Sequence, residues 1–206
     1  EHVSCIIMEF NTGRILGMAD YPNYDLNDTR NKDNLIGMPL LNEDSVRTGE
    51  SVTREILDGM DDAAMYRQLN ALWKNYCITD AYEPGSVAKP FTVAAALEAG
   101  AIKGNESYEC KGELHVGDHD ISCHQTYGDG YINVQQGIER SCNVVLMNVA
   151  FALGKDAFVD YQRLFGMGLK TNIDLAGEAR TASMVFNQNT MGPTDLATNS
   201  FGQSFN

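Results

Sequence analysis

Basic residues are scarce in this sequence, and long hydrophobic runs are missing. Among 206 residues, 15 lysines and arginines stand against 28 acidic residues, which gives a net charge of −13. Such a surface repels phosphate backbones and anionic lipid heads, so binding to nucleic acid or to a membrane surface is not expected. The longest apolar stretch, residues 144–153, is interrupted by Asn148 and falls short of the ~18 residues of a membrane span.

Repeats, low-complexity linkers and a signal-like N-terminal segment are also missing. A composition of 43% hydrophobic and 21% charged residues is typical of an ordinary globular protein. We therefore predict one mixed α/β domain over residues 1–206. Because the sequence ends at Asn206 without a residue pattern that ends an element, we expect it to be part of a longer protein.

Hydrophobic patterns and turn residues predict both strands and helices. Residues 3–9 and 14–19 are expected to form a β-hairpin around the turn at Asn11 and Gly13. The acidic residues 42–62 are expected to form a solvated loop with a short helix. Helices are expected over 65–73, 86–99, 133–140, 144–153 and 158–165.

The five cysteines form an odd set, which argues against a complete disulfide framework. Cys5 and Cys77 have apolar sequence neighbours and are expected to be small core residues. The remaining three, Cys110, Cys123 and Cys142, have polar neighbours and bear on a metal site.

The segment around Ser86 carries the first chemical signal. A serine at a helix start lies near free backbone N–H groups that stabilise developing negative charge. Lys89 lies one turn further on the same face, and if buried it could accept the hydroxyl proton as a neutral amine. Taken alone, Ser-x-x-Lys far more often marks a capping serine with a snorkelling lysine.

A second short motif strengthens the catalytic interpretation of Ser-x-x-Lys. Ser141-Cys142-Asn143 falls in a break between two predicted helices. A serine there could relay a proton to a leaving group, and the amide of Asn143 could hold Lys89 and a substrate carbonyl. Ser-x-x-Lys followed by Ser-x-Asn is the arrangement of penicillin-binding proteins and serine β-lactamases.

The chain resembles the transpeptidase domain of class B penicillin-binding proteins, of the type of sporulation or division transpeptidases of Gram-positive bacteria. The similarity rests on the nucleophile segment TDAYEPGSVAKPFT and on four further segments in order along the chain. These are residues 8–22, YGDGYINVQQGIERSCN, NIDLAGE and ATNSFGQSFN. The resemblance implies an antiparallel sheet with helices on both faces, whose last strands lie outside this sequence.

By resemblance, Ser86 is the acylated nucleophile, Lys89 its general base, and Ser141 and Asn143 the second-motif residues. The implied reaction joins peptidoglycan stem peptides through an acyl-enzyme, and β-lactams would acylate the same serine. The family's third motif, Lys-Thr-Gly or Lys-Ser-Gly, is absent, so residues 1–206 alone are expected to be inactive. No cofactor is implied for the chemistry.

A group of soft ligands departs from the family pattern. Cysteine, histidine and aspartate side chains crowd between residues 110 and 124, and a further cysteine stands inside Ser-x-Asn. We predict a zinc site formed by Asp120, Cys123, His124 and Cys142. His119 and Cys110 are alternatives for the fourth ligand. A Cys110–Cys123 disulfide and unrelated loop residues remain open, as does a redox role in which thiolate oxidation releases the metal.

Three other functions compete with the transpeptidase. A serine β-lactamase would share Ser86 and Lys89, but no Glu-x-x-Leu-Asn segment is present. A β-lactam sensor would need a signalling partner, and a non-catalytic zinc or redox module would leave the paired serine motifs unexplained. The resemblance further implies a membrane anchor preceding this sequence, a location outside the cytoplasmic membrane and a membrane glycosyltransferase as partner.

Overall fold

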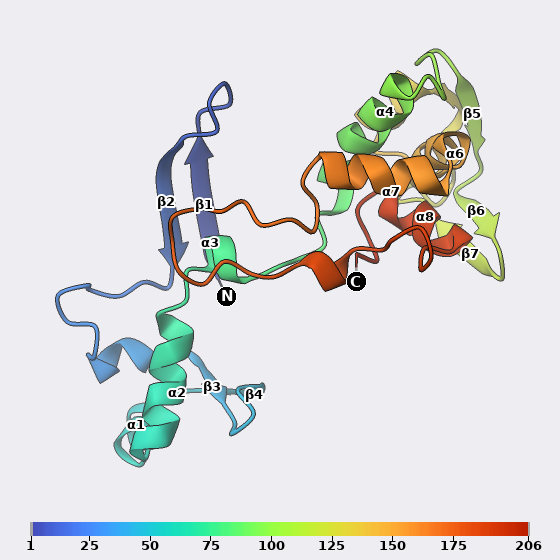
Figure 1. Ribbon diagram of the computed structural model, residues 1–206. Coiled ribbons are helices and arrows are strands. Elements are labelled where there is room, and N and C mark those ends of the chain that lie inside the picture. Colours follow the sequence, from blue (N-terminus) through green and yellow to red (C-terminus); the bar gives the residue numbers. More distant parts are fainter. Residues whose placement is uncertain (1, 206) are drawn as a thin grey trace. The chain divides into compact units, whose positions relative to one another are not determined.

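The computed structural model describes residues 2–205, which separate into two compact units (Figure 1). The first unit holds the residues up to Asp80 together with Leu175–Ala179. The second holds Ala81–Asp174 and the residues from Arg180 onward. No helix in the described part of the chain combines the length and hydrophobicity needed to cross a bilayer.

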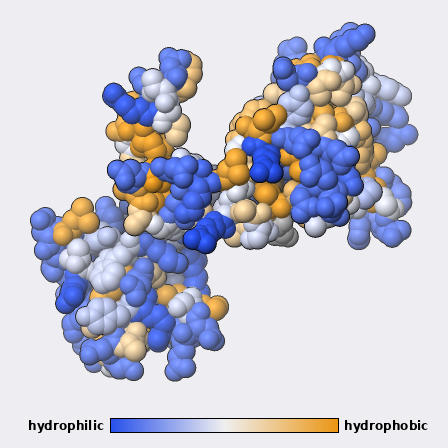
Figure 2. Space-filling model, viewed as in Figure 1, coloured by the Kyte–Doolittle hydropathy of each residue, from blue (hydrophilic) through white to orange (hydrophobic). Residues whose placement is uncertain are grey.

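The first unit opens with an antiparallel hairpin of β1 (Val3–Met8) and β2 (Ile15–Tyr21). Its hydrophobic side chains are largely exposed, as the orange surface of the hairpin in Figure 2 shows. The elements that follow are η1 (Lys32–Leu35), β3 (Pro39–Leu41), β4 (Arg47–Ser51), α1 (Arg54–Asp58), α2 (Asp62–Leu72) and α3 (Tyr76–Thr79). They enclose a small core of Leu35, Met38, Val52, Leu57, Leu69 and Leu72.

The second unit is built around one apolar helix, α6 (Asn143–Leu153). Its helical neighbours are η2 (Gly85–Ala88), α4 (Lys89–Glu98), α5 (Val134–Glu139), α7 (Lys155–Leu164), η3 (Ala182–Met184) and α8 (Pro193–Asn199). The strands pair antiparallel, β5 (Ser107–Cys110) with β8 (Gly130–Asn133) and β6 (Glu113–Val116) with β7 (His119–Ser122). Helix α6 packs against α4, α5, α7, α8 and β5. A helix that is hydrophobic on all faces is expected to be buried in this way.

The mixed α/β class with antiparallel strands is confirmed, and within residues 2–205 those strands lie in four separate pairs. The predicted hairpin and the five predicted helices are present with bounds shifted by a few residues. Helix α8 and the pairing of β5 with β8 were not predicted. The expected burial of Cys5 is wrong, because this side chain is exposed, while Cys77 is half-buried beside Asp20.

Candidate active site and adjoining cysteine cluster

The turn before α4 presents Ser86 to solvent. Gly85 has φ +61°, a left-handed conformation that a glycine adopts without strain, and the chain then enters η2. Ser86 is exposed, whereas Lys89 three residues later is only 2% exposed. The helical turn therefore places the two groups on one face, with the hydroxyl accessible and the amine buried.

Ser141 connects the two residues. The Nζ of Lys89 donates to the backbone carbonyl of Ser141 at 2.6 Å and to its Oγ at 2.8 Å. The Oγ of Ser141 in turn donates to the Oγ of Ser86 at 2.9 Å. A continuous hydrogen-bonded path thus runs from Ser86 through Ser141 to Lys89. Proton transfer between nucleophile and amine needs such a path.

Burial lowers the pKa of Lys89 from its ordinary value, because removal from water disfavours the ammonium form. Negative charge on Cys123 and Cys142 acts in the opposite direction and raises the same pKa. The net shift is downward, so this amine is neutral at a lower pH than an exposed lysine. A neutral amine is the form that can accept a proton.

The turn between α5 and α6 sets the position of Ser141. Its backbone has φ +55°, which is unusual for a residue other than glycine. The N–H of Ser141 donates to Ile138 O at 3.0 Å and that of Cys142 to Gly137 O at 2.8 Å, so the end of α5 holds the turn closed. A Cβ at Gly137 would collide with Val145 of α6, which explains how closely the two helices approach.

Asn143, the first residue of α6, is bonded to the segment after β7. Its backbone N–H donates to Cys123 Sγ at 3.3 Å, and its side-chain Nδ2 donates to Ser122 O at 3.2 Å. The contact with Lys89 expected for this amide is therefore replaced by one with Ser122. Asn143 links the second motif to the cysteine cluster.

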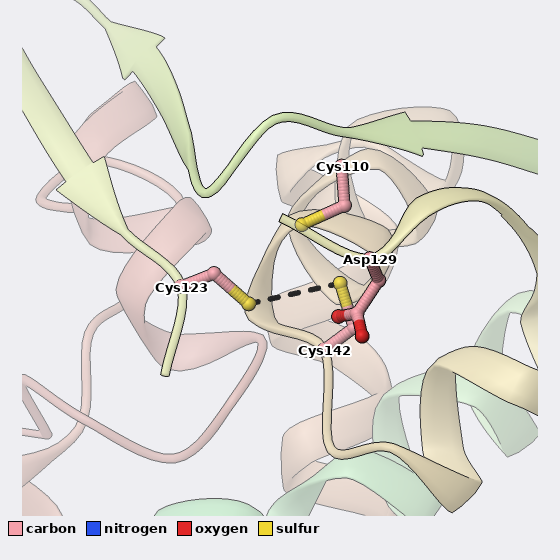
Figure 3. Close-up of side chains that lie close together, drawn as sticks. All are labelled: Cys110, Cys123, Asp129 and Cys142. Atoms are coloured by element: carbon pink, nitrogen blue, oxygen red, sulfur yellow. Dashed lines mark hydrogen bonds between the residues drawn. The ribbon is translucent and has the colours of Figure 1, made fainter. Parts of the chain in front are cut away.

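Four side chains of the second unit converge beside this turn. Cys110, Cys123, Asp129 and Cys142 place their ligand atoms within 4.8 Å of one another (Figure 3). The three cysteines are at most 3% exposed, and the sulfurs of Cys123 and Cys142 are 3.7 Å apart. All five cysteines of the chain are free thiols, so the alternative Cys110–Cys123 disulfide is not formed.

Strand pairing brings these four residues together. Cys110 ends β5 opposite Gly130, so Asp129, which immediately precedes β8, lies beside it. The N–H of Cys123 donates to Gly112 O at 2.7 Å, which ties the end of β7 to the loop after β5. Cys142 enters from the N-terminal end of α6.

The carboxylate of Asp129 in the cluster has a partner for only one of its two oxygens. The Oδ2 of Asp129 is buried without a hydrogen-bond partner, and its Oδ1 lies 3.9 Å from Arg140 Nη1. Burial raises the pKa of the Cys142 thiol. Burial also opposes ionisation of Cys123, but N–H groups of Gln125, Val144 and Asn143 outweigh it and lower the pKa of that thiol.

The predicted metal ligands are only partly brought together. Cys123 and Cys142 lie in the cluster, but Asp120 instead bonds His115 across β6 and β7, with Oδ1 and Nδ1 2.6 Å apart. The exposed His124 is not part of it. Cys110, weighed as an alternative ligand, takes one of these two places, and Asp129 takes the other. Asp129 was missed because the pairing of β5 with β8, which no local spacing reveals, carries it there.

An exposed serine, a buried lysine and a second serine that bonds to both are an arrangement suited to serine acyl transfer. The sequence matches the penicillin binding protein transpeptidase domain over residues 3–204, and the chain belongs to this family. It is 30% identical to stage V sporulation protein D of Bacillus subtilis over 200 residues, which is 96% of this chain and 25% of that protein. Peptidoglycan D,D-transpeptidase FtsI of Escherichia coli K12 is 28% identical over 178 residues, which is 86% of this chain and 24% of the relative.

The fold agrees with solved structures. Pseudomonas aeruginosa PBP2, in complex with WCK 5153, gives a TM-score of 0.69 at 23% identity and matches 99% of this chain and 42% of that one. This likeness concerns the fold alone. The chain spans about a quarter of the length of the two curated relatives named above.

Proposed function

We propose that this chain carries the acylation site of a peptidoglycan D,D-transpeptidase, with Ser86 as nucleophile. The observation that supports the assignment is the path from Ser86 Oγ through Ser141 Oγ to Lys89 Nζ, with both hydrogen bonds shorter than 3 Å. E. coli FtsI, a relative by sequence, is named for this activity. The substrate would be the D-Ala-D-Ala end of a stem peptide, handled outside the cytoplasmic membrane.

Acylation exchanges the C–N bond of the substrate for an ester bond to Ser86 and moves one proton to the leaving amine. As Ser86 Oγ attacks the carbonyl carbon of the penultimate D-Ala, its proton passes to Ser141, and the proton of Ser141 passes to neutral Lys89. The C–N bond to the terminal D-Ala then breaks, and the proton returns along the same path to the leaving amine. An amine of a second stem peptide attacks the ester, forming the C–N bond of the cross-link as the C–O bond to Ser86 breaks. One proton of that amine passes along the same path to Ser86 Oγ and restores the hydroxyl.

Covalent labelling tests this proposal. A fluorescent penicillin should label the protein as it is encoded, with any residues beyond 1 and 206 retained, and the label should lie on Ser86. Ser86→Ala should abolish it and leave the folded state intact. Equal labelling of Ser86→Ala would refute the assignment. Because the third motif is absent from residues 1–206, these residues alone should give no stable acyl-enzyme; robust labelling of them at Ser86 would contradict that expectation.

We also propose that Cys110, Cys123, Asp129 and Cys142 bind zinc. Three sulfurs and one carboxylate oxygen within 4.8 Å are a suitable set for a tetrahedral Zn²⁺. The half-buried Asp129 carboxylate pairs with Arg140 through Oδ1, and a cation would balance its Oδ2, which has no hydrogen-bond partner. Zinc would act structurally, because Cys123 and Cys142 flank Asn143 in space and hold the second motif. A peroxide that oxidised two of the thiolates to a disulfide, and was itself reduced, would release the metal and make the site redox-sensitive.

Metal analysis decides the zinc proposal. Protein purified without chelator should contain about one zinc per chain. Cys142→Ser should lose it, whereas Cys77→Ser, a cysteine of the other unit, should retain it. Absence of zinc from the wild type, or unchanged zinc in Cys142→Ser, would refute the site.

A further inference from the structure

The segment that follows α8 lies directly against the turn that carries Ser86. The N–H of Gly85 donates to Gly202 O at 2.9 Å, and the N–H of Ser204 donates to the Oε1 of Glu83 at 2.7 Å. A Cβ at Gly202 would overlap the backbone oxygen and nitrogen of Gly85, and Gly202 has φ +86°. The two backbones are therefore in contact, and glycine is required at this position.

Backbone bonds from Gly202 N–H to Asn199 O and from Gln203 N–H to Thr198 O tie this segment to the end of α8. The buried side chain of Asn199 holds it further. It is 1% exposed, and its Nδ2 donates to Gln203 O at 3.0 Å and to Ser204 O at 3.1 Å. Its Oδ1 accepts a hydrogen bond from Gln162 Nε2 at 3.3 Å. Both amide hydrogens and the acceptor are used, so the side chain has one favourable orientation.

Capping of α8 does not account for these bonds. Ser200 is the C-cap residue, and its N–H closes the helix on Leu196 O. Asn199 instead donates to carbonyls four and five residues further along the chain, outside the helix. Ser204 has φ +57°, a strained conformation for a residue other than glycine, and such strain persists only where neighbouring bonds impose it.

We infer that Asn199 is a positioning residue for the nucleophile. Its amide fixes Gln203 and Ser204. Ser204 bonds to Glu83, and Gly202 of the same segment bonds to Gly85, so the segment sets the distance from Ser86 Oγ to Ser141 Oγ. A displacement of about 1 Å at a reacting atom can reduce a rate about a hundredfold. This inference rests on the proposed acylation of Ser86.

The test separates binding from chemistry in the protein as encoded. Penicillin acylation is followed by stopped flow, which gives a non-covalent dissociation constant and an acylation rate constant. Asn199→Leu, similar in size but without donors, should lower the rate constant by about tenfold or more and leave the dissociation constant within about threefold. The matched control Asn148→Leu removes an amide bond to Val144 O within α6 and should leave both constants within about twofold. A rate constant for Asn199→Leu within about threefold of wild type, in folded protein, overturns the inference.

A second pair of variants acts from the solvent side and covers the case in which Asn199→Leu fails to fold. Glu83 is exposed, so its replacement does not disturb the core. Glu83→Ala removes the acceptor for Ser204 N–H and should lower the rate constant by about threefold to tenfold. Glu83→Gln keeps a carbonyl oxygen and should restore it to within about twofold. Equal losses in the two variants, or none in Glu83→Ala, overturn the inference.

Failure of the proposed function can be told apart from failure of this inference. If the wild type is not acylated at Ser86, the proposed function is wrong, and amide hydrogen exchange of residues 83–88 decides the role of Asn199. Exchange there should be about tenfold faster in Asn199→Leu and unchanged in Asn148→Leu. Unchanged exchange in Asn199→Leu overturns the positioning role.

Discussion

The hydrogen-bonded path from Ser86 to Lys89 and the cysteine cluster meet at Ser141-Cys142-Asn143 but are assembled differently. Ser86 and Lys89 come from one helical turn, and a single turn between α5 and α6 completes the path. The cluster takes its four side chains from the ends of β5, β7 and α6 and from the residue preceding β8. Helical periodicity fixes the first site locally, whereas the second depends on the register of strand pairs. The two should therefore respond differently to substitution.

The largest expected effect comes from a substitution of Lys89, which should affect acylation but not the cysteine cluster. Lys89→Met removes the proton acceptor and fills a buried position with an apolar chain of similar length. Acylation should fall by about a thousandfold, since general-base catalysis contributes factors of this order. The zinc content should be unchanged. The melting temperature should be unchanged or higher. Acylation kinetics with metal analysis checks both, and a variant that retains most of its rate would exclude Lys89 as the base.

Gly128 offers a way to break the cluster without removing a ligand. It has φ +80°, and a Cβ there would overlap Cys110 O. Gly128→Ala should cost about 3 kcal/mol of unfolding free energy, because the strand ends must separate. Gly130→Ala has a similar φ of +69° but open space around its Cβ, and should cost only about 1 kcal/mol. Denaturant unfolding measures both, and equal costs would show that the approach of the two loops is not tight.

Asp129 and Asp120 test the structure against the sequence. Asp129→Asn keeps the size but removes the charge beside the three sulfurs, and should weaken zinc about 10- to 100-fold. Asp120→Asn should leave the affinity unchanged, because Asp120 is exposed and bonded to His115. Competition with a chromophoric chelator measures both affinities. The reverse order of effects would restore the ligand set expected from sequence alone.

The contrast between these two aspartates shows which site residues can be predicted from the sequence and which cannot. Ser86, Lys89, Ser141 and Asn143 could be proposed because helix spacing and a motif in a helix break are local features. Cys123 and Cys142 could be paired because the second motif was expected to fold against the preceding loop. Asp129 could not be found, since its place beside Cys110 depends on which strands pair and in what register. The bonds of Asn199 to residues 203 and 204 also need the tertiary fold.

The smallest expected effect concerns pH. Because burial lowers the pKa of Lys89 below its ordinary 10.5, the neutral amine forms at lower pH, and acylation should rise with pH to a plateau reached earlier than for an ordinary lysine. Below the midpoint the rate should fall about tenfold per pH unit. The unfolded state binds the proton more tightly than the folded state, so stability relative to Lys89→Met should increase as pH rises from the lowered pKa toward 10.5. A pH profile of the acylation rate and unfolding at several pH values measure both. A midpoint at or above 10.5 would mean that the amine is not desolvated in the working site.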